Sequence, residues 1–210
     1  MSTTARPTVS VITATRNRPE QLENALRSIA RQFFRDFKSI VVDDGSNNAV
    51  FDTYECIWQG LDNRFHLADP QTPGAPGTGP ADARNRGLAM ASGEFVAFLD
   101  DDDEWIAPDH LQVGIDAMKR LDADWFFADM QGHRNGKVTK SNWFDCAPFL
   151  ITRSTQVAGL DGIREVPLAI VLRTLQRQVI HPDIVIVRRE IVQRFGGFLK
   201  YTWQMRVTTF

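Results

Sequence analysis

The stretch "FVAFLDDDDEW", residues 95–105, runs from an apolar segment directly into five acidic residues and ends in a tryptophan. Two like charges about 4 Å apart cost roughly 1 kcal/mol in water, and about 4 kcal/mol at the effective dielectric of a protein surface. In an open α/β sheet, ligands gather at the carboxyl ends of the strands. The stretch therefore predicts a buried strand that ends at a binding edge of such a sheet.

The segments around this stretch alternate between strand and helix patterns. Residues 8–14 and 38–44 are rich in β-branched residues, and residues 19–29 carry apolar side chains at helical spacing. Further strands are expected at 64–68, 94–99, 124–130 and 183–189, and further helices at 48–59, 81–91, 108–121 and 165–177. Asn135 and Gly136 predict a hairpin turn. The alternation predicts an α/β fold with a mostly parallel central sheet, flanking helices and the hairpin as a small antiparallel addition.

The composition narrows the class of protein. The chain has 210 residues with 24 basic and 26 acidic side chains, so no nucleic-acid partner is expected. Cys56 and Cys146 fit neither a metal-ligand spacing nor a disulfide framework and favour a cytoplasmic setting. The N-terminus lacks the apolar core of a secretory signal, and the apolar stretch 166–172 is too short to span a bilayer, which leaves peripheral membrane contact open. The Pro/Gly-rich residues 69–80 are interpreted as a loop within one domain, because the alternation resumes after them.

The acidic run at 100–104 has two interpretations. As a solvated loop before a helix that begins at Pro108, it would gain about 0.3–1 kcal/mol from the helix dipole, which accounts for one or two carboxylates but not four. As a cation site, its oxygen ligands suit Mg²⁺, Mn²⁺ or Ca²⁺, and the ion would relieve the repulsion and bridge to substrate phosphates. An EF-hand is excluded because Trp105 stands where that loop needs glycine. The cation site is the favoured interpretation.

A second acidic pair, Asp43 and Asp44, ends the earlier predicted strand. Taken alone, the pair followed by Gly45 and Ser46 is equally typical of a turn that caps the next helix. Because both acidic clusters end strands, we expect them to share one crevice. The arginines of "RNR", residues 84–86, are either solvated on a helix or face this crevice and meet phosphate or ribose oxygens.

The order and spacing of these motifs resemble the inverting family 2 glycosyltransferases of the GT-A fold. The resemblance is carried by "VSVITATRNRPEQLENALRSIARQ", "SIVVDDGS", "ARNRGLAMASGEFVAFLDDDDEW" and "PDHL", and more weakly by "HPDIVIVRREIVQRFGGF" at 181–198. It implies one GT-A domain over 1–210, with a nucleotide-sugar-binding half at 1–111 and an acceptor-side half at 112–210 that is short at its C-terminus. The implied activity is hexosyltransferase-type transfer from a nucleotide-diphosphate sugar, most simply a UDP-sugar, to a hydroxyl acceptor with inversion. The implied cofactor is Mn²⁺ or Mg²⁺, and the acceptor would be a saccharide, a lipid-linked or another hydroxyl compound.

The resemblance also assigns roles to single residues. It places the end of the first strand beside the nucleotide base and makes Asp44 an acceptor of a hydrogen bond from that base. It identifies Asp100-Asp101-Asp102 as the DXD motif, which would hold the diphosphate through the cation. The implied nucleotide-sugar contacts are Ala14, Arg16, Asp44, Arg84, Asn85, Asp100 and Asp101, and the implied metal ligands are Asp102 and Asp103.

One feature departs from the family pattern. Relatives of this type carry an acidic pair shortly after Gly-Gly-Phe, and its carboxylate deprotonates the acceptor hydroxyl. In this sequence the last acidic residue is Glu190. A base must lie within hydrogen-bond reach of the acceptor proton. Three alternatives stay open: the chain is a fragment, another acid such as Asp183 or Asp145 serves as base, or the protein binds a nucleotide-sugar and transfers it poorly or not at all.

A receiver-type phosphoacceptor is the competing class, because receivers also place acidic pairs at strand ends. The position of Asp43 and Asp44 argues against it, since the pair follows the second predicted strand instead of the first. The Pro/Gly-rich loop at 69–80 is also foreign to that fold.

Overall fold

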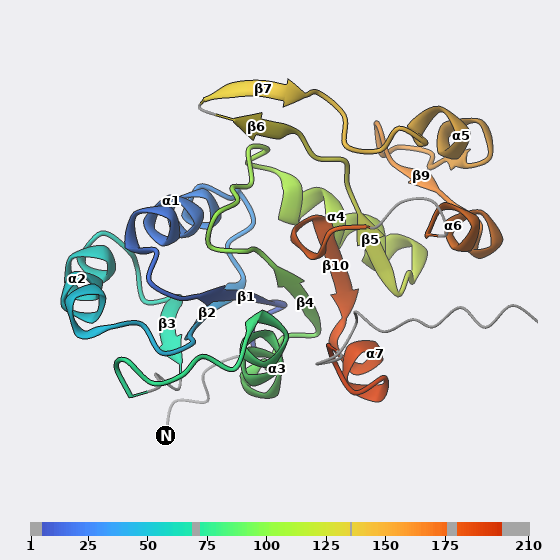
Figure 1. The fold of residues 1–210 in the computed structure, drawn as a ribbon. Helices are drawn as coiled ribbons and strands as arrows, with labels where there is room; N and C mark the ends of the chain where they lie inside the picture. The colour runs from blue at the N-terminus through green and yellow to red at the C-terminus, as the bar shows by residue number, and fades with distance from the viewer. Residues whose placement is uncertain (1–5, 69–71, 135, 176–179, 199–210) are drawn as a thin grey trace, which may run out of the picture.

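The computed structural model describes residues 6–68, 72–134, 136–175 and 180–198 (Figure 1). Its main strands are β1 (Val9–Thr15), β2 (Phe37–Asp43), β3 (Phe65–Ala68), β4 (Phe95–Phe98), β5 (Trp125–Phe127) and β10 (Val185–Arg188). They form a six-stranded sheet in the order β3-β2-β1-β4-β10-β5. The first four strands in this order are parallel, whereas β10 runs antiparallel to both of its neighbours.

Helices cover both faces of this sheet (Figure 1). The covering helices are α1 (Pro19–Ala30), α2 (Asn48–Gln59), α3 (Pro80–Met90), α4 (His110–Leu121) and α7 (Arg189–Arg194). Two more helices, α5 (Ala147–Thr152) and α6 (Leu168–Leu175), lie to the side of the sheet (Figure 1). Side chains of α1, α2 and α4 join the larger apolar cluster on one face, and those of α3 and α7 join the smaller cluster on the other. Within the described ranges, no helix combines the length and the apolarity needed to cross a lipid bilayer.

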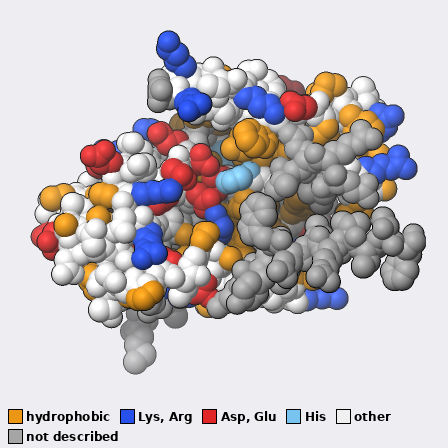
Figure 2. Space-filling model, in the orientation of Figure 1, with side chains coloured by type: hydrophobic (Ala, Val, Ile, Leu, Met, Phe, Trp, Pro, Cys, Tyr) orange, Lys and Arg blue, Asp and Glu red, His pale blue; other side chains and the backbone are white. Residues whose placement is uncertain are grey.

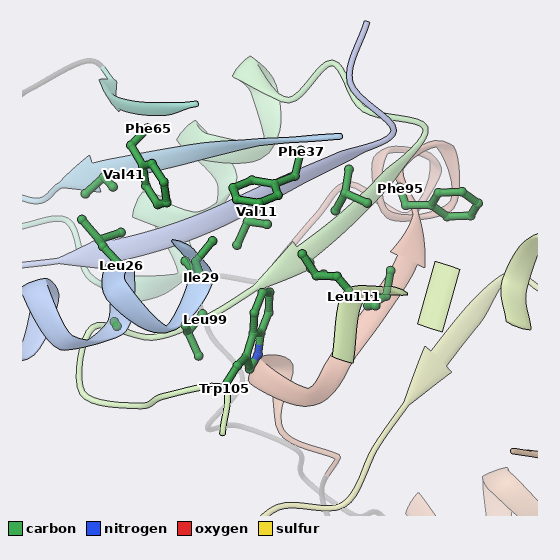
Figure 3. Packing of buried hydrophobic residues seen from close by; sticks show 14 of the residues in the cluster. Val11, Leu26, Ile29, Phe37, Val41, Phe65, Phe95, Leu99, Trp105 and Leu111 are labelled. Carbon is green, nitrogen blue, oxygen red and sulfur yellow. The ribbon is translucent and has the colours of Figure 1, made fainter. Parts of the chain in front are cut away.

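The strand side chains alternate between the two faces, as the period of two in a strand requires. Val11 and Val41 face α1 and meet Leu26 and Ile29 (Figure 3). Ile12, one position further along β1, belongs to the cluster on the opposite face. The same alternation continues past the ends of the strands, so consecutive acidic residues there are directed to different sides of the sheet.

The elements predicted from the sequence are confirmed with small shifts of their ends. The helix over 48–59 has the predicted bounds, and the helix expected from residue 108 begins at His110. The helix expected over 165–177 is α6, and its last two expected residues lie outside the described residues. Residues 69–71 of the predicted loop and Asn135 of the predicted turn also lie outside them.

The antiparallel part of the fold differs from the expectation. The predicted hairpin consists of β6 (Gly132–Arg134) and β7 (Lys137–Lys140), which form a two-stranded sheet of their own. Another small pair joins β8 (Thr155–Gln156) to β9 (Arg164–Glu165). The antiparallel member of the central sheet is β10, because this strand begins at the edge where β4 ends. The residues that precede β10 therefore lie beside the residues that follow β4.

Candidate functional site

Strand alternation separates the two members of the first acidic pair. Asp43 is fully buried on the α2 side, where its Oδ1 accepts hydrogen bonds from the backbone of Gly45 at 2.8 Å and Ser46 at 2.7 Å. Its Oδ2 accepts a hydrogen bond from the hydroxyl of Tyr54. These contacts shape the turn after β2, which is the structural role that the turn interpretation assigned to the pair.

Asp44 faces the other side, toward α3. Its Oδ1 accepts hydrogen bonds from Thr78 Oγ1 and Arg86 Nη2, each at 2.8 Å. Its Oδ2 accepts a hydrogen bond from the backbone of Gly79, also at 2.8 Å. The carboxylate thus fastens the start of α3 to the end of β2, and at 5 % exposure it forms part of the floor of the crevice.

The acidic run after β4 is divided in the same way. Asp100 points toward α3, where Arg84 Nη2 lies 2.5 Å from both of its carboxylate oxygens. Asp101 points toward α1, is 5 % exposed, and accepts a hydrogen bond from Thr15 Oγ1 at 2.8 Å. Burial raises the pKa of Asp101 above its usual value, and the Thr15 hydrogen bond opposes this shift.

Arg18, in the loop between β1 and α1, reduces the repulsion between Asp101 and Asp102. Its Nη1 lies 3.1 Å from Asp101 Oδ1 and 2.7 Å from Asp102 Oδ2. The two carboxylates raise the pKa of Arg18 above its usual value. Asp102 is itself 54 % exposed, so this ion pair is open to solvent and is readily exchanged. Without a bound cation, Asp100, Asp101 and Asp102 are therefore paired with arginines from two different segments of the chain.

Asp103 turns away from Arg18 and approaches Asp183, which lies in the short 3₁₀ helix η1 (Pro182–Ile184) before β10. The pKa of Asp103 is raised to about 7, chiefly because its protonated carboxyl hydrogen-bonds to Asp183, with burial adding to the effect. Asp183 is 3 % exposed, and its Oδ1 accepts a hydrogen bond from the backbone of Asp100 at 3.1 Å. Its Oδ2 lies 3.4 Å from Nδ1 of His181, whose pKa is raised mainly by the Asp183 carboxylate.

Two cavities meet at the acidic run. The first has a volume of about 440 Å³ and is lined by the ends of β1 and β4, the start of α3 and the side chain of Asp44. The second, of about 590 Å³, lies between the run, α4 and the hairpin segment, with Trp105, His110 and Asp129 among its walls. Asp102 lines both cavities. Figure 2 shows acidic side chains gathered near the middle of this face with basic side chains beside them.

The structure brings most of the residues assigned from the sequence to the first cavity. Those that line it are Ala14, Arg16, Asp44, Arg84, Asp100, Asp101 and Asp102. Asp103 lines the second cavity instead. Asn85 is not among the residues that line the first cavity; its side-chain amide donates a hydrogen bond to the backbone carbonyl of Phe198 and accepts one from the backbone N–H of Phe198, each at 2.8 Å. Asp145, one of the two acids considered as a base, is paired with Lys140 and is 82 % exposed at its side chain.

Sequence reasoning missed three polar residues of the site. Arg18 is the second arginine of "TRNRP", and no sequence motif indicates that it bridges two aspartates. Arg86 is one of the arginines expected either to be solvated or to face the crevice, but nothing in the sequence identifies Asp44 as its partner. His181 was passed over because the direction of β10 was not foreseen. A signal was present for His181, since residues that precede an antiparallel strand lie at the edge where parallel strands end.

Comparison with known proteins agrees with this architecture. The family model for glycosyl transferase family 2 matches residues 10–196. A Campylobacter jejuni relative, GalNAc(5)-diNAcBac-PP-undecaprenol beta-1,3-glucosyltransferase, is 39 % identical over 101 residues, which cover 48 % of this chain and 31 % of the relative. TarS 1–349 of S. aureus in complex with UDP-GlcNAc has a TM-score of 0.62 at 25 % identity, covering 91 % of this chain and 48 % of TarS 1–349.

A second solved structure is the mannosyltransferase PcManGT from Pyrobaculum calidifontis in complex with GDP-Man and Mn²⁺. It has a TM-score of 0.64 at 20 % identity and covers 94 % of this chain and 49 % of PcManGT. The chain thus spans about half of each solved structure and about a third of the curated relative. The mostly parallel six-stranded sheet is that of GT-A glycosyltransferases, and the family match extends over nearly all of the described residues. The chain belongs to glycosyl transferase family 2.

Proposed function

We propose that this chain binds a nucleotide-diphosphate sugar, with a UDP-sugar as its donor, and transfers the sugar with inversion to a hydroxyl acceptor. The observation that carries the proposal is the cavity of about 440 Å³, which is lined by seven of the nine residues assigned from the sequence. The complexes of TarS with UDP-GlcNAc and of PcManGT with GDP-Man and Mn²⁺ support a nucleotide-diphosphate donor.

In this proposal, Asp44 receives a hydrogen bond from the nucleotide base, and Ala14 and Arg16 flank the base. Arg84 and Asp100, which already form an ion pair at the cavity wall, lie along the sugar and diphosphate. Because a guanidinium binds phosphate oxygens as well as carboxylates, the exposed Arg18 is free to turn from Asp102 to the diphosphate. That exchange would uncover Asp102 for a cation.

Asp102 and Asp103 are the proposed ligands of Mn²⁺ or Mg²⁺ in the donor complex. Their carboxylates are hard oxygen ligands, which suit either ion, and a site with few protein ligands leaves coordination positions for phosphate oxygens. When bound, the ion would supply Lewis-acid stabilisation of the leaving nucleoside diphosphate. Arg18 would give up its contact with Asp102 at that stage, so the protein exchanges one positive partner for another.

The acceptor is proposed to enter the larger cavity of about 590 Å³. This cavity includes residues of the 112–210 half and shares Asp102 with the donor cavity, so an acceptor hydroxyl there would approach the donor sugar. The Campylobacter jejuni relative is named for a PP-undecaprenol acceptor, which makes a lipid-linked acceptor the first class to test.

Calorimetric titration of UDP in the presence and absence of Mn²⁺ tests the donor half of the proposal. We expect UDP to bind more tightly with Mn²⁺, and Asp102→Asn to reduce this metal-dependent gain about tenfold or more. Asp116→Asn, which removes an exposed carboxylate of α4 that accepts a hydrogen bond from Gln112 in the same helix, is the matched control. If UDP binds neither with nor without Mn²⁺, the proposal is refuted.

The transfer step needs a separate assay. Radiolabelled UDP-glucose and UDP-N-acetylglucosamine are incubated with saccharide and lipid-linked acceptors, and the anomeric configuration of the product is determined by NMR. Product of inverted configuration is expected. Tight UDP binding without transfer to any acceptor would instead identify a donor-binding protein.

A further inference from the structure

A cluster of polar side chains lies on the side of the acidic run that faces away from Arg18. One ligand atom each from Asp100, His181 and Asp183 lies within 4.8 Å of the other two. Asp100 follows β4, whereas His181 and Asp183 precede β10, so the antiparallel pairing of these two strands brings the three residues together. The pairing of two strands of the central sheet thus holds these three residues near one another.

The surrounding structure fixes the direction of the Asp183 carboxylate. Its Oδ1 is held by the backbone amide of Asp100, and its own backbone carbonyl accepts a hydrogen bond from Trp105 Nε1 at 2.7 Å. Trp105 belongs to the larger core cluster and is 7 % exposed, which gives this anchor a rigid base. With one oxygen and the backbone secured, Oδ2 lies 3.4 Å from Nδ1 of His181.

Two atoms in this cluster lack a hydrogen bond of normal length, although the carboxyl of Asp103 also approaches Asp183 when it is protonated. Oδ2 of Asp183 and Nδ1 of His181 are buried and have no hydrogen-bond partner among the described residues. They lie 3.4 Å apart, which is longer than a normal N–H···O hydrogen bond. A buried carboxylate oxygen without a partner is costly, whereas a cation between the two atoms would satisfy both. This is the independent sign that the cluster accommodates a ligand.

The neighbouring aspartates are occupied differently. Asp102 is exposed and paired with Arg18, so in the absence of nucleotide an arginine already fills its cation position. Asp100 is paired with Arg84, but each carboxylate oxygen has a further lone pair that can face the cluster. Within the described ranges, the nucleotide-free protein therefore offers a group of possible ligand atoms at Asp183 and His181, next to Asp100, that no arginine fills.

We propose that Asp100, His181 and Asp183 form a divalent-cation site in the nucleotide-free protein, separate from the Asp102 position assigned to the donor complex. Two carboxylates and one imidazole favour Mn²⁺ or another transition ion over Mg²⁺ and Ca²⁺, which prefer all-oxygen sites. The site itself needs no nucleotide, and only the use of the ion in donor binding rests on the proposed function.

The test is a titration of the metal-free protein with Mn²⁺ in the absence of nucleotide. The electron paramagnetic resonance signal of the free ion measures how much Mn²⁺ is bound. We expect one bound Mn²⁺, displaced poorly by excess Mg²⁺. Asp183→Asn and His181→Gln should each weaken binding about tenfold or more, because each removes a ligand atom. The side-chain amide introduced by Asp183→Asn keeps an acceptor for the Asp100 backbone, and circular dichroism and thermal unfolding confirm that both variants fold.

Two variants distinguish this site from an ion held elsewhere on the acidic surface. Asp116→Asn, which removes an exposed carboxylate, should bind Mn²⁺ as the unchanged chain does. If Asp102→Asn loses nucleotide-free Mn²⁺ binding while Asp183→Asn and His181→Gln keep it, the ion lies at Asp102 and the proposal is overturned. Failure of the unchanged chain to bind Mn²⁺ would overturn it as well, and would mean that the carboxylates share only a proton.

A parallel UDP titration of the same proteins keeps the two proposals apart. Mn²⁺ binding that depends on Asp183 and His181, in a chain that does not bind UDP, would support the cation site and refute the proposed donor. If the chain binds UDP and its Mn²⁺ affinity is unaffected by Asp183→Asn and His181→Gln, the result would support the proposed donor and refute the cation site.

Discussion

Replacement of His110 by phenylalanine should make the protein less sensitive to mild acid. His110 begins α4, is 8 % exposed, and stacks against Trp105 and Phe126 with ring centroids 5.0 Å and 5.9 Å away. Its Nε2 is buried without a hydrogen-bond partner among the described residues. Burial therefore lowers the pKa of His110 from its usual 6.5 to about 4, and nearby Asp109 opposes this only weakly. Phenylalanine keeps the aromatic packing and removes the proton-binding group.

The expected size follows from linkage between proton binding and folding. As the pH falls through 6.5, the unfolded chain takes up a proton on His110, whereas the folded chain does so only near pH 4. Stability is therefore lost between these two values and levels off below pH 4. At about 1.4 kcal/mol per pKa unit, His110 alone accounts for a loss of about 2 kcal/mol between pH 7 and pH 5.

Urea unfolding of both proteins at pH 7 and pH 5 measures this difference. The His110→Phe variant should lose about 2 kcal/mol less than the unchanged chain between the two conditions. Carboxylates such as Asp103 also titrate in this range, but they are present in both proteins and cancel in the comparison. Equal losses of unfolding free energy in the two proteins would refute a buried, neutral His110.

Three further substitutions probe contacts that position the site. Gly87→Val would place a Cβ 2.5 Å from the side chain of Ile12 in β1, so α3 should be displaced. The free energy of unfolding should fall by about 1–3 kcal/mol, and an unchanged urea midpoint would contradict this. Asn85→Ala removes both side-chain hydrogen bonds to the backbone of Phe198, so the backbone amide of Phe198 should exchange hydrogen faster, whereas unaltered protection would show that the contact is dispensable. Trp105→Phe leaves the buried carbonyl of Asp183 without its donor and should cost about 1–3 kcal/mol in denaturant unfolding, and a value near zero would argue against that anchor.

Local patterns were sufficient to predict the elements that pack by themselves. The apolar offsets from Leu22 to Ile29 predicted α1, and all the side chains at those offsets are buried. The turn chemistry of Asn135 and Gly136 indicated the β6–β7 pair. In contrast, the antiparallel direction of β10 depends on where the chain re-enters the sheet, which its own residues do not encode. The hydrogen bonds from Gly45 and Ser46 to Asp43 are local to the Asp-Asp-Gly-Ser motif, whereas the hydrogen bond from Tyr54 depends on how α2 packs beside the end of β2.

The sequence by itself determined the order of strands and helices, the family, and the position of carboxylates at the ends of two parallel strands. It did so because the period of an element and the chemistry of a short motif are local properties of the chain. Only the tertiary structure decided that Arg18 and Arg84 pair with three aspartates of the acidic run and that Asp183 meets the backbone of Asp100 from 83 residues away. Contacts of that range depend on the path of the whole chain. The Asp183 contact arises where β10 runs back along β4, and the Arg18 contact arises where β1 lies beside β4. The four aspartates therefore follow a local pattern, but their partners, and the two unpaired atoms beside them, are properties of the fold.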